Sequence, residues 1–389
     1  MNGKTLLFAW ELGEGLGHLP ALKAIALAAK AEGARVVFAL RDPVLTRAAL
    51  AEVEAQILPA PFWPTPRLPT TLSGTHADLL VANGFSSAAN LRALIEAWDQ
   101  VFDLVKPDLV VCEHAPGAAM AAFGRIPAAF VGNGFVVPPA DAPEFPPFEP
   151  GRGEPMRQRP VLAVMQEALF GLKRAAPKTI TEPFRGVFRG VYSFPPLDTY
   201  RHARREPVLG PIEAVPALTP LPAKRRLFAY SAADYALIDA VVQALMNVGP
   251  EAEAFFRGSL GARAPVLTSR GVSVHEMAPA LAGVLPGVSA VFSHGGTGFT
   301  NAAFAAGRPH IVNPRHFEAT ATARALEAIG AGICLVPFDA AKFRDALSRV
   351  NEDGAMRAAA QKAGEAAQAF MKTAAPLETT MARLRAVFA

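Results

Sequence analysis

The chain contains 389 residues, of which 51% are hydrophobic and 19% are charged, and its formal net charge is +4. This length and apolar content predict two domains with full hydrophobic cores and exclude a disordered or fibrous chain. A charge balance this mild excludes a dedicated nucleic-acid binder, whose basic residues crowd one module. The two cysteines, Cys112 and Cys334, lie far apart inside apolar runs. They exclude a disulfide framework and a cysteine-based metal site, and they suit a reducing cytoplasm.

No segment has the pattern of an export signal or a membrane span. The first apolar run, Leu6–Trp10, is closed at once by Glu11, which leaves it shorter than the apolar part of a secretory signal. The longest uncharged stretches, residues 126–140 and 277–293, contain Pro or Gly and fall short of the roughly 20 apolar residues that cross a bilayer. We therefore expect a cytoplasmic protein.

The first half of the chain alternates between strand and helix patterns. Two strand-helix-strand units are expected: strands 5–10 and 35–40 around a helix opened by Pro20, and strands 108–112 and 128–132 around helix 117–123. Such units form parallel sheets, so we expect one doubly wound domain. A further helix is expected near residues 161–174.

A proline-rich stretch, residues 211–222, separates this half from a second α/β series. The expected strands are 226–230, 252–256, 290–293, 310–313 and 333–336, and the expected helices are 234–246, 298–306, 318–329, 340–350 and 355–371, with a last helix ending the chain. The two halves therefore look like one architecture used twice.

Basic residues gather in residues 151–205, which hold eleven Lys and Arg against four acidic residues. A solvated face is one interpretation. The other is a surface that attracts an anionic acceptor or makes peripheral contact with a membrane.

The turn after the first strand contains Gly13, Gly15 and Gly17, followed by His18. Glycines here invite a dinucleotide interpretation, but the fingerprint G-x-G-x-x-G requires glycine at position 18. His18 instead lies where the chain enters a helix at the carboxyl edge of the sheet, where open α/β sheets bind ligands. An imidazole there can act as a base, and Glu113, at the end of strand 108–112, could orient it if the two strands are neighbours. A loop or capping role for His18 is the alternative.

In the second half, the turn Ser293–Gly298 joins a buried strand to an alanine-rich helix. Bare glycines expose backbone N–H groups, and a helix start carries positive partial charge, so the turn could bind an anion. An ordinary tight connection has the same order of elements.

Together these segments resemble the GT-B glycosyltransferases, specifically the UDP-glycosyltransferase and macrolide/glycopeptide glycosyltransferase superfamily. The C-terminal signature of that family is echoed by residues 294–298, 307–309, Pro314, Ala323 and 330–332. Gly17-His18-Leu19-Pro20 resembles the motif that holds the family's base, residues 107–113 resemble the strand that ends in its acidic partner, and Leu209-Gly210-Pro211 resembles the entry into its linker.

The resemblance implies an α/β GT-B fold, with two Rossmann-like doubly wound domains facing across a cleft. We expect an acceptor-binding domain over residues 1–211, a linker over 212–225, a nucleotide-sugar-binding domain over 226–375 and a terminal helix over 376–389 that returns to the first domain. The implied activity is an inverting, metal-independent transfer of a sugar from a UDP- or dTDP-sugar to an acceptor hydroxyl, with no cofactor besides this co-substrate.

The resemblance also implies roles for particular residues. His18 would deprotonate the acceptor and Glu113 would orient His18. The donor would be held by Gly17, His275, His294, Gly295, Gly296, Thr297, Gly298 and Glu318, with His275 near the base and the N–H groups of residues 295–298 on the diphosphate. No residues are expected to hold a metal.

Several positions depart from the family pattern. Phe299 replaces a Thr or Ser that helps to hold phosphate, Ala302 replaces a Glu that binds ribose, and Glu318-Ala319 replaces an Asp-Gln pair that reads sugar hydroxyls. These departures leave three alternatives: an unusual donor, the same donor held by residues such as Arg308, Asn313 or His316, or a catalytically degenerate GT-B-like protein that binds without turnover.

Aromatic residues within 62–90 and 133–175 predict an apolar, small-molecule or lipid-like acceptor. They are Phe62, Trp63, Phe85, Phe135 and Phe148. Packing against the sheet is the alternative role for these rings.

Overall fold

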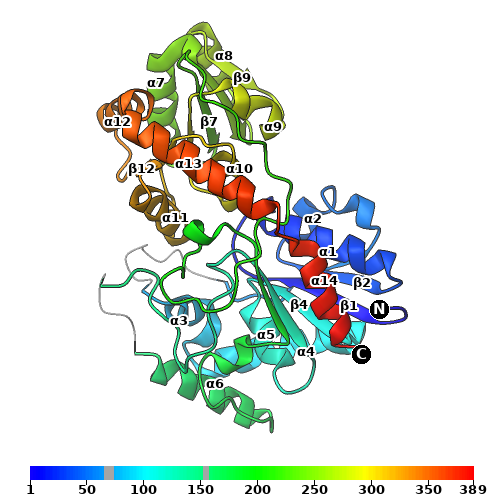
Figure 1. Ribbon diagram of the computed structural model, residues 1–389. Coiled ribbons are helices and arrows are strands. Elements are labelled where there is room, and N and C mark those ends of the chain that lie inside the picture. Colours follow the sequence, from blue (N-terminus) through cyan, green and yellow to red (C-terminus); the bar gives the residue numbers. More distant parts are fainter. Residues whose placement is uncertain (65–73, 152–156) are drawn as a thin grey trace. The chain divides into compact units, whose positions relative to one another are not determined.

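The computed structural model describes residues 1–64, 74–151 and 157–389 (Figure 1). The chain forms two compact units. Unit 1 contains residues 1–193, 198–213 and 375–389, and unit 2 contains residues 194–197 and 214–374. Each unit is built around one six-stranded parallel sheet flanked by helices, which confirms the predicted α/β class.

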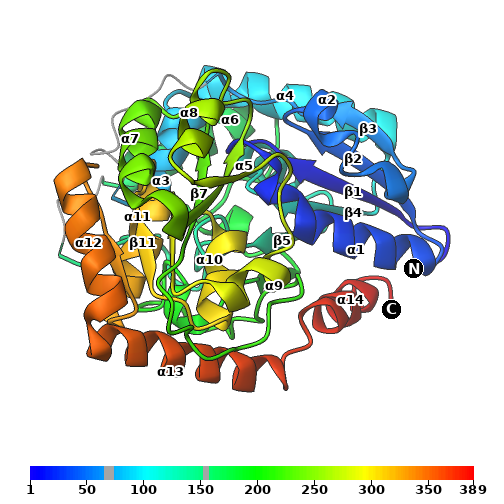
Figure 2. The same cartoon turned by 90° about the horizontal axis from the view of Figure 1, so that it is seen from above.

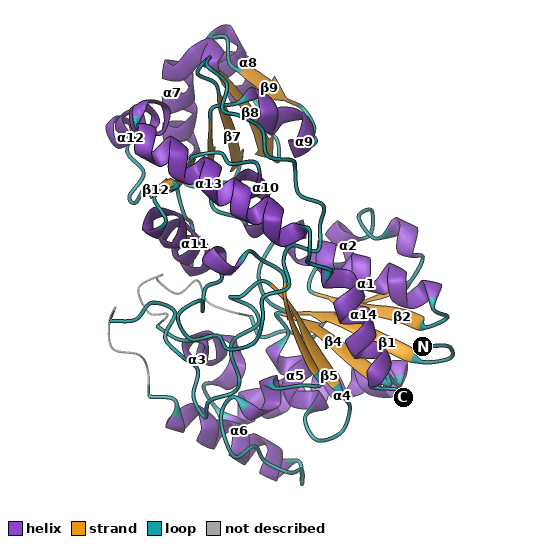
Figure 3. Ribbon diagram, viewed as in Figure 1, coloured by secondary structure: helices purple, strands orange, loops and turns teal. Residues whose placement is uncertain are grey.

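Unit 1 has the sheet order β3-β2-β1-β4-β5-β6. The strands are β1 (Thr5–Trp10), β2 (Arg35–Leu40), β3 (Gln56–Pro59), β4 (Leu109–Glu113), β5 (Ala128–Gly132) and β6 (Phe188–Val191). The helices are α1 (Leu19–Ala31), α2 (Pro43–Thr46), α3 (His76–Leu80), α4 (Ala88–Val105), α5 (Pro116–Ala122), α6 (Arg159–Gly171) and α14 (Pro376–Ala386). Every residue of β1, β4 and β5 is buried, as expected for central strands covered on both faces (Figure 3).

The C-terminal helix α14 packs in unit 1, against α1 and β6 (Figures 1 and 2). Met381 and Leu384 belong to the same buried cluster as Leu6 of β1. The Tyr192 and Thr380 hydroxyls also share a hydrogen bond of 2.7 Å. The last helix is thus part of the core of unit 1, although about 160 residues of unit 2 precede it.

Unit 2 has the sheet order β12-β11-β10-β7-β8-β9. The strands are β7 (Leu227–Ala232), β8 (Ala252–Arg257), β9 (Ser273–His275), β10 (Ala290–Ser293), β11 (His310–Val312) and β12 (Gly332–Cys334). The helices are α7 (Ile238–Val248), α8 (Arg263–Ser269), α9 (Leu281–Val284), α10 (Thr297–Ala305), α11 (Phe317–Ala328), α12 (Ala340–Glu352) and α13 (Gly354–Met371). When the six strands of unit 2 are counted from one to six along the chain and the sheet is read from the β9 edge, the strand order is the same as in unit 1.

Residues 216 and 219 of the predicted linker are hydrogen-bonded to helix α13 of unit 2. The amides of Gln361 and Gln368, both on α13, donate to the carbonyls of Thr219 at 3.2 Å and Pro216 at 2.8 Å. The Arg308 guanidinium also contacts the Thr219 hydroxyl. In the described part of the chain, no helix is long and apolar enough to cross a membrane.

Candidate active site

The sheet of unit 1 brings His18 and Glu113 into contact. His18 ends a short 3₁₀ helix (Leu16–His18) that follows β1, and Glu113 is the last residue of β4. The two strands pair directly, with Trp10 opposite Glu113. His18 Nδ1 lies 2.9 Å from both carboxylate oxygens of Glu113. Because Nδ1–H of a neutral imidazole would donate to the carboxylate, Nε2 is left as the proton acceptor.

The His18 ring is held from two further sides. Trp10 stacks on it, with ring centroids 5.0 Å apart and planes 23° apart. Gly13 has a φ of +90°, and a Cβ at this position would collide with Nε2 and Cε1 of His18. Glycine is therefore required at position 13 both by the backbone conformation and by the imidazole.

His114 is a second imidazole beside the dyad. Its ring centroid lies 6.0 Å from that of His18, its φ is +46°, and neither of its inaccessible ring nitrogens has a hydrogen-bond partner. Burial lowers the pKa of His114 well below its usual range. The ring is therefore neutral, and it adds no positive charge to oppose protonation of His18.

The turn after β10 is shaped by hydrogen bonds within the sheet of unit 2. Gly295 has a φ of +87°, and a Cβ there would lie 2.8 Å from Val312 Cγ1. The Gly295 N–H donates to Ser293 Oγ at 3.0 Å, and this hydroxyl lies 2.8 Å from His310 Nε2. The expected use of the Gly295 N–H on a phosphate therefore conflicts with this arrangement, in which the group already has an acceptor.

The rest of the turn leads into α10. Gly296 is the residue before the first helical residue, Thr297, and Gly298 is exposed. The first N–H groups of a helix have no acceptor within the helix, so an anion can bind there. Thr297 Oγ1 donates to Glu318 Oε1 at 3.1 Å. Glu318, in the first turn of α11, thus lies beside the turn.

His294 lies among positively charged groups. Its pKa is lowered to about 4, first by burial and then by the charges of Arg315, His316 and Arg257. The Tyr230 ring meets it edge-on at 5.1 Å, and its Nδ1 is buried without a hydrogen-bond partner. A neutral imidazole in a positive potential suits an anionic ligand.

Two other expected donor residues belong to other segments of the chain. Gly17 is in unit 1, next to His18, with open space where a side chain would lie. His275 ends β9 in unit 2, where its ring meets Phe228 edge-on at 6.0 Å and its Nε2 lies 3.8 Å from Glu253.

The residues considered as substitutes for missing donor contacts have protein partners. Arg308 is buried, and its Nε donates to the Leu285 carbonyl at 2.7 Å. Asn313 accepts from the Tyr235 hydroxyl and donates to the Leu335 carbonyl. His316 precedes α11 and accepts from the Ala319 N–H at 3.4 Å.

The departures at Phe299 and Ala302 create an apolar patch beside the turn. Both residues are 7% exposed and belong to one cluster with Phe228. The Phe299 ring also packs at 5.5 Å from Tyr230 and at 5.6 Å from His310. These side chains offer no hydrogen bond to ribose or phosphate.

Three of the five aromatic residues expected to line an acceptor site are core residues. Phe85, Phe135 and Phe148 are each at most 5% exposed, and the last two stack at 5.0 Å. Phe62 is 39% exposed, with the Arg41 guanidinium 4.3 Å from its ring centre. Trp63 packs against Gly84. The parts of the expected acceptor segments in residues 65–73 and 152–156 lie outside the described residues.

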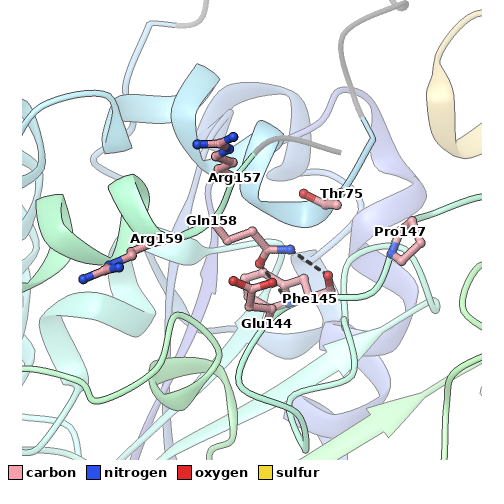
Figure 4. Close-up of a pocket in the computed structure, with 7 residues that line it drawn as sticks. All are labelled: Thr75, Glu144, Phe145, Pro147, Arg157, Gln158 and Arg159. Carbon is pink, nitrogen blue, oxygen red and sulfur yellow. Dashed lines mark hydrogen bonds between the residues drawn. The ribbon is translucent and has the colours of Figure 1, made fainter. Parts of the chain in front are cut away.

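A pocket of about 430 Å³ opens in unit 1 near the starts of α3 and α6 (Figure 4). It is lined by Thr75, Glu144, Phe145, Pro147, Arg157, Gln158 and Arg159. The side-chain amide of Gln158 is used within the protein, because its oxygen accepts from the Phe145 N–H and its nitrogen donates to the Phe145 carbonyl. No predicted catalytic or donor-binding residue lines this pocket.

Part of the positive charge in residues 151–205 is neutralised by carboxylates. Ion pairs join Arg174 to Asp99 at 2.6 Å, Arg189 to Asp141 at 2.8 Å, and Arg204 to Asp198 at 2.6 Å. These pairs favour a structural role for three of the eleven basic residues, and contact with a membrane stays a prediction.

Comparisons with known proteins agree on one architecture. Residues 269–380 match the family model of the erythromycin biosynthesis protein CIII-like C-terminal domain. The crystal structure of CalG4, the calicheamicin glycosyltransferase, matches with a TM-score of 0.70 and 18% identity, over 100% of this chain and 98% of that chain. The chain has the GT-B glycosyltransferase fold. This confirms the GT-B fold expected from the sequence.

Two further GT-B structures match over nearly the whole chain. The glycotransferase of kitacinnamycin has a TM-score of 0.65 and 19% identity, covering 99% of this chain and 100% of that one. The spinosyn rhamnosyltransferase SpnG complexed with thymidine diphosphate has a TM-score of 0.60 and 18% identity, and the match covers 94% of this chain and 96% of that chain. A search of curated proteins found no match.

Among the described residues of this GT-B chain, no group of three or more His, Cys, Asp or Glu side chains could hold a metal ion.

Proposed function

We propose that this GT-B chain is an inverting glycosyltransferase that moves a sugar from a nucleoside diphosphate sugar to a hydroxyl of an apolar acceptor. The contact between His18 and Glu113 carries the proposal, because a carboxylate beside Nδ1 favours the tautomer in which Nε2 can act as a general base. The fold comparisons support the same class of reaction.

In this mechanism His18 Nε2 accepts the proton of the acceptor hydroxyl, and Glu113 stabilises the imidazolium that forms. The acceptor oxygen forms a bond to the anomeric carbon while the bond from that carbon to the diphosphate oxygen breaks. The electron pair of the broken bond stays on the diphosphate. A single displacement of this kind inverts the anomeric configuration.

The charge that develops on the diphosphate would be stabilised by the N–H groups at the start of α10 and by the positive potential near His294. These groups supply positive charge without a metal ion. A UDP- or dTDP-sugar is the proposed donor, and the thymidine diphosphate complex of the spinosyn rhamnosyltransferase supports the second of these.

The alternative function is binding without turnover. Phe299 and Ala302 favour it, because their apolar side chains leave ribose and phosphate groups without hydrogen bonds. Such a protein would bind nucleoside diphosphates but would not release them from a sugar donor.

Turnover separates the two functions. The protein is incubated with UDP- and dTDP-sugars and a set of apolar hydroxyl acceptors, and both the released nucleoside diphosphate and the glycosylated product are measured. We expect His18→Ala and Glu113→Gln to lower kcat by about 100-fold or more, since each removes part of the base, with little change in nucleotide affinity. Full turnover by His18→Ala would refute the base, and nucleotide binding with no turnover would favour the alternative.

A further inference from the structure

Arg315 is an arginine of unit 2 whose polar contacts within the protein are all long, while its guanidinium lies 4.2 Å from the centre of the Tyr235 ring. Its Nη2 lies 3.5 Å from Ser231 Oγ and 3.4 Å from the Ala232 carbonyl, and its Nη1 lies 3.7 Å from Asp234 Oδ1. Its Nε is buried with no hydrogen-bond partner. Because N–H donors normally bond at 2.7–3.2 Å, this guanidinium makes no short charge-assisted bond.

Two other poorly exposed arginines, Arg204 and Arg308, are bonded differently. Arg204 Nε lies 2.6 Å from Asp198, and its Nη2 lies 2.8 Å from the Val137 carbonyl. Arg308 Nε donates at 2.7 Å to the Leu285 carbonyl. These guanidinium groups hold segments of the chain together. The Arg315 side chain is only 19% exposed and makes no short hydrogen bond of this kind, so the desolvation of its N–H groups is only partly compensated.

The topology places Arg315 across the end of β10. It follows β11, and its guanidinium reaches Ser231 and Ala232 at the end of β7. Since β10 lies between β11 and β7 in the sheet, the side chain crosses the carboxyl end of β10, where the turn 294–298 begins. The influence of Arg315 on the pKa of His294 agrees with this placement.

Asp234, the carboxylate that Arg315 contacts at 3.7 Å, neutralises its charge only in part. Asp234 is 74% exposed and lies 3.8 Å from a second arginine, Arg257. Two arginines and His294 thus face one solvent-exposed carboxylate at this edge of the sheet. The excess positive charge fits a ligand that carries more than one negative charge.

We propose that Arg315 binds the diphosphate of the donor, a role that rests on the proposed function. Its fork of N–H donors suits phosphate oxygens and offers positive charge beside the turn. This contact would also replace the hydroxyl that is missing at Phe299.

Calorimetric titration of nucleotides tests this assignment without any sugar acceptor. Thymidine diphosphate and UDP are titrated into the unchanged protein, Arg315→Gln, Arg315→Lys and Arg324→Gln, and thymidine and uridine serve as ligands without phosphate. Arg324 is the matched control, because it is 48% exposed on α11 and pairs with Glu327. Thermal unfolding verifies that each variant is folded.

We expect Arg315→Gln to bind the diphosphates about tenfold more weakly or worse, since it loses a charge-assisted bond, with nucleoside affinity unchanged. The diphosphate affinity of Arg315→Lys should lie between those of Arg315→Gln and the unchanged protein. The affinity of Arg324→Gln should equal that of the unchanged protein. Equal diphosphate affinity in Arg315→Gln would overturn the inference alone. Failure of the unchanged protein to bind either diphosphate would overturn the donor site as well.

Discussion

At the scale of single residues, the contact between His18 and Glu113 depends on uncharged neighbours as well as on the two partners. Trp10 stacks on His18, and Gly13 leaves room for Nε2. Glu113 is itself flanked by Gly132, where a Cβ would lie 3.2 Å from Glu113 Oε1. The dyad is therefore built into its surroundings, because small residues stand where a side chain would displace either partner.

Gly13→Ala should abolish most turnover. The added Cβ must move the His18 ring, and the φ of +90° is unfavourable for alanine. We expect kcat to fall about 100-fold, on the scale of losing a general base. Gly124→Ala is the control, because its φ is +71° and a Cβ there meets nothing within 4 Å. Equal losses in the two variants would assign the effect to backbone strain instead of His18.

At the scale of elements, neighbouring strands shape the donor turn. Ser293 ends β10, His310 begins β11, and both side chains are at most 1% exposed. Their contact links β11 to the Gly295 N–H through the Ser293 hydroxyl. The sequence offered no periodic signal for this contact, since it depends on the pairing of two strands.

Ser293→Ala should destabilise unit 2 and weaken nucleotide binding. The variant leaves His310 Nε2 and the Gly295 N–H buried without partners, at a cost of about 1–3 kcal/mol. Urea unfolding measures this loss, and titration with thymidine diphosphate measures the affinity. Ser289→Ala, which breaks contacts with Arg226 and Asn351 at the other end of the sheet, should lower stability without a specific effect on affinity. Unchanged affinity in Ser293→Ala would show that the turn does not need this hydroxyl.

At the scale of the whole molecule, buried titratable groups make both units sensitive to pH. Burial lowers the pKa of His76 in unit 1 and of His310 in unit 2 to about 3, from a usual value of 6.5. Burial also raises the pKa of Glu11 in unit 1 from 4.5 to about 8. These shifts act in opposite directions as the pH changes.

The histidines predict a loss of stability in acid. In the folded protein they stay neutral below pH 6.5, whereas in the unfolded chain they bind protons, so the free energy of unfolding falls as the pH falls from 6.5 toward 3. His76→Gln should reduce this slope. Urea unfolding at a series of pH values measures it, and a slope unchanged by the substitution would rule out His76 as a source.

Glu11 predicts a loss of stability toward alkaline pH. Its carboxyl binds a proton in the folded state above pH 4.5, where the unfolded chain has lost it, so the free energy of unfolding falls as the pH rises from 4.5 to 8. Glu11→Gln should remove this part of the pH dependence. The same urea series compares the two proteins between pH 5 and 8, and identical slopes would contradict the prediction.

Much of the fold could be predicted from the sequence, because the central strands are continuous apolar runs bounded by Pro, Gly or charge. Strands β1, β2, β5 and β10 have the predicted ends. The edge strands β3, β6 and β9 were not predicted, since they have only three or four residues and are partly exposed. Helix α4 was also missed, although Leu91, Ile95 and Trp98 lie on one buried face.

The sequence by itself determined the α/β class, the repeated architecture and the positions of both glycine-rich turns, because these depend on local patterns of apolar residues and glycine. It also supplied both members of the His18 and Glu113 pair. The tertiary structure alone decided that they touch, that the Gly295 N–H is occupied, and that Arg315 reaches β7 across β10. The first and third of these contacts join residues 84 or more positions apart, and the strand order that brings them together has no local signal. The bond from the Gly295 N–H joins residues only two positions apart, but it depends on the folded conformation of the turn.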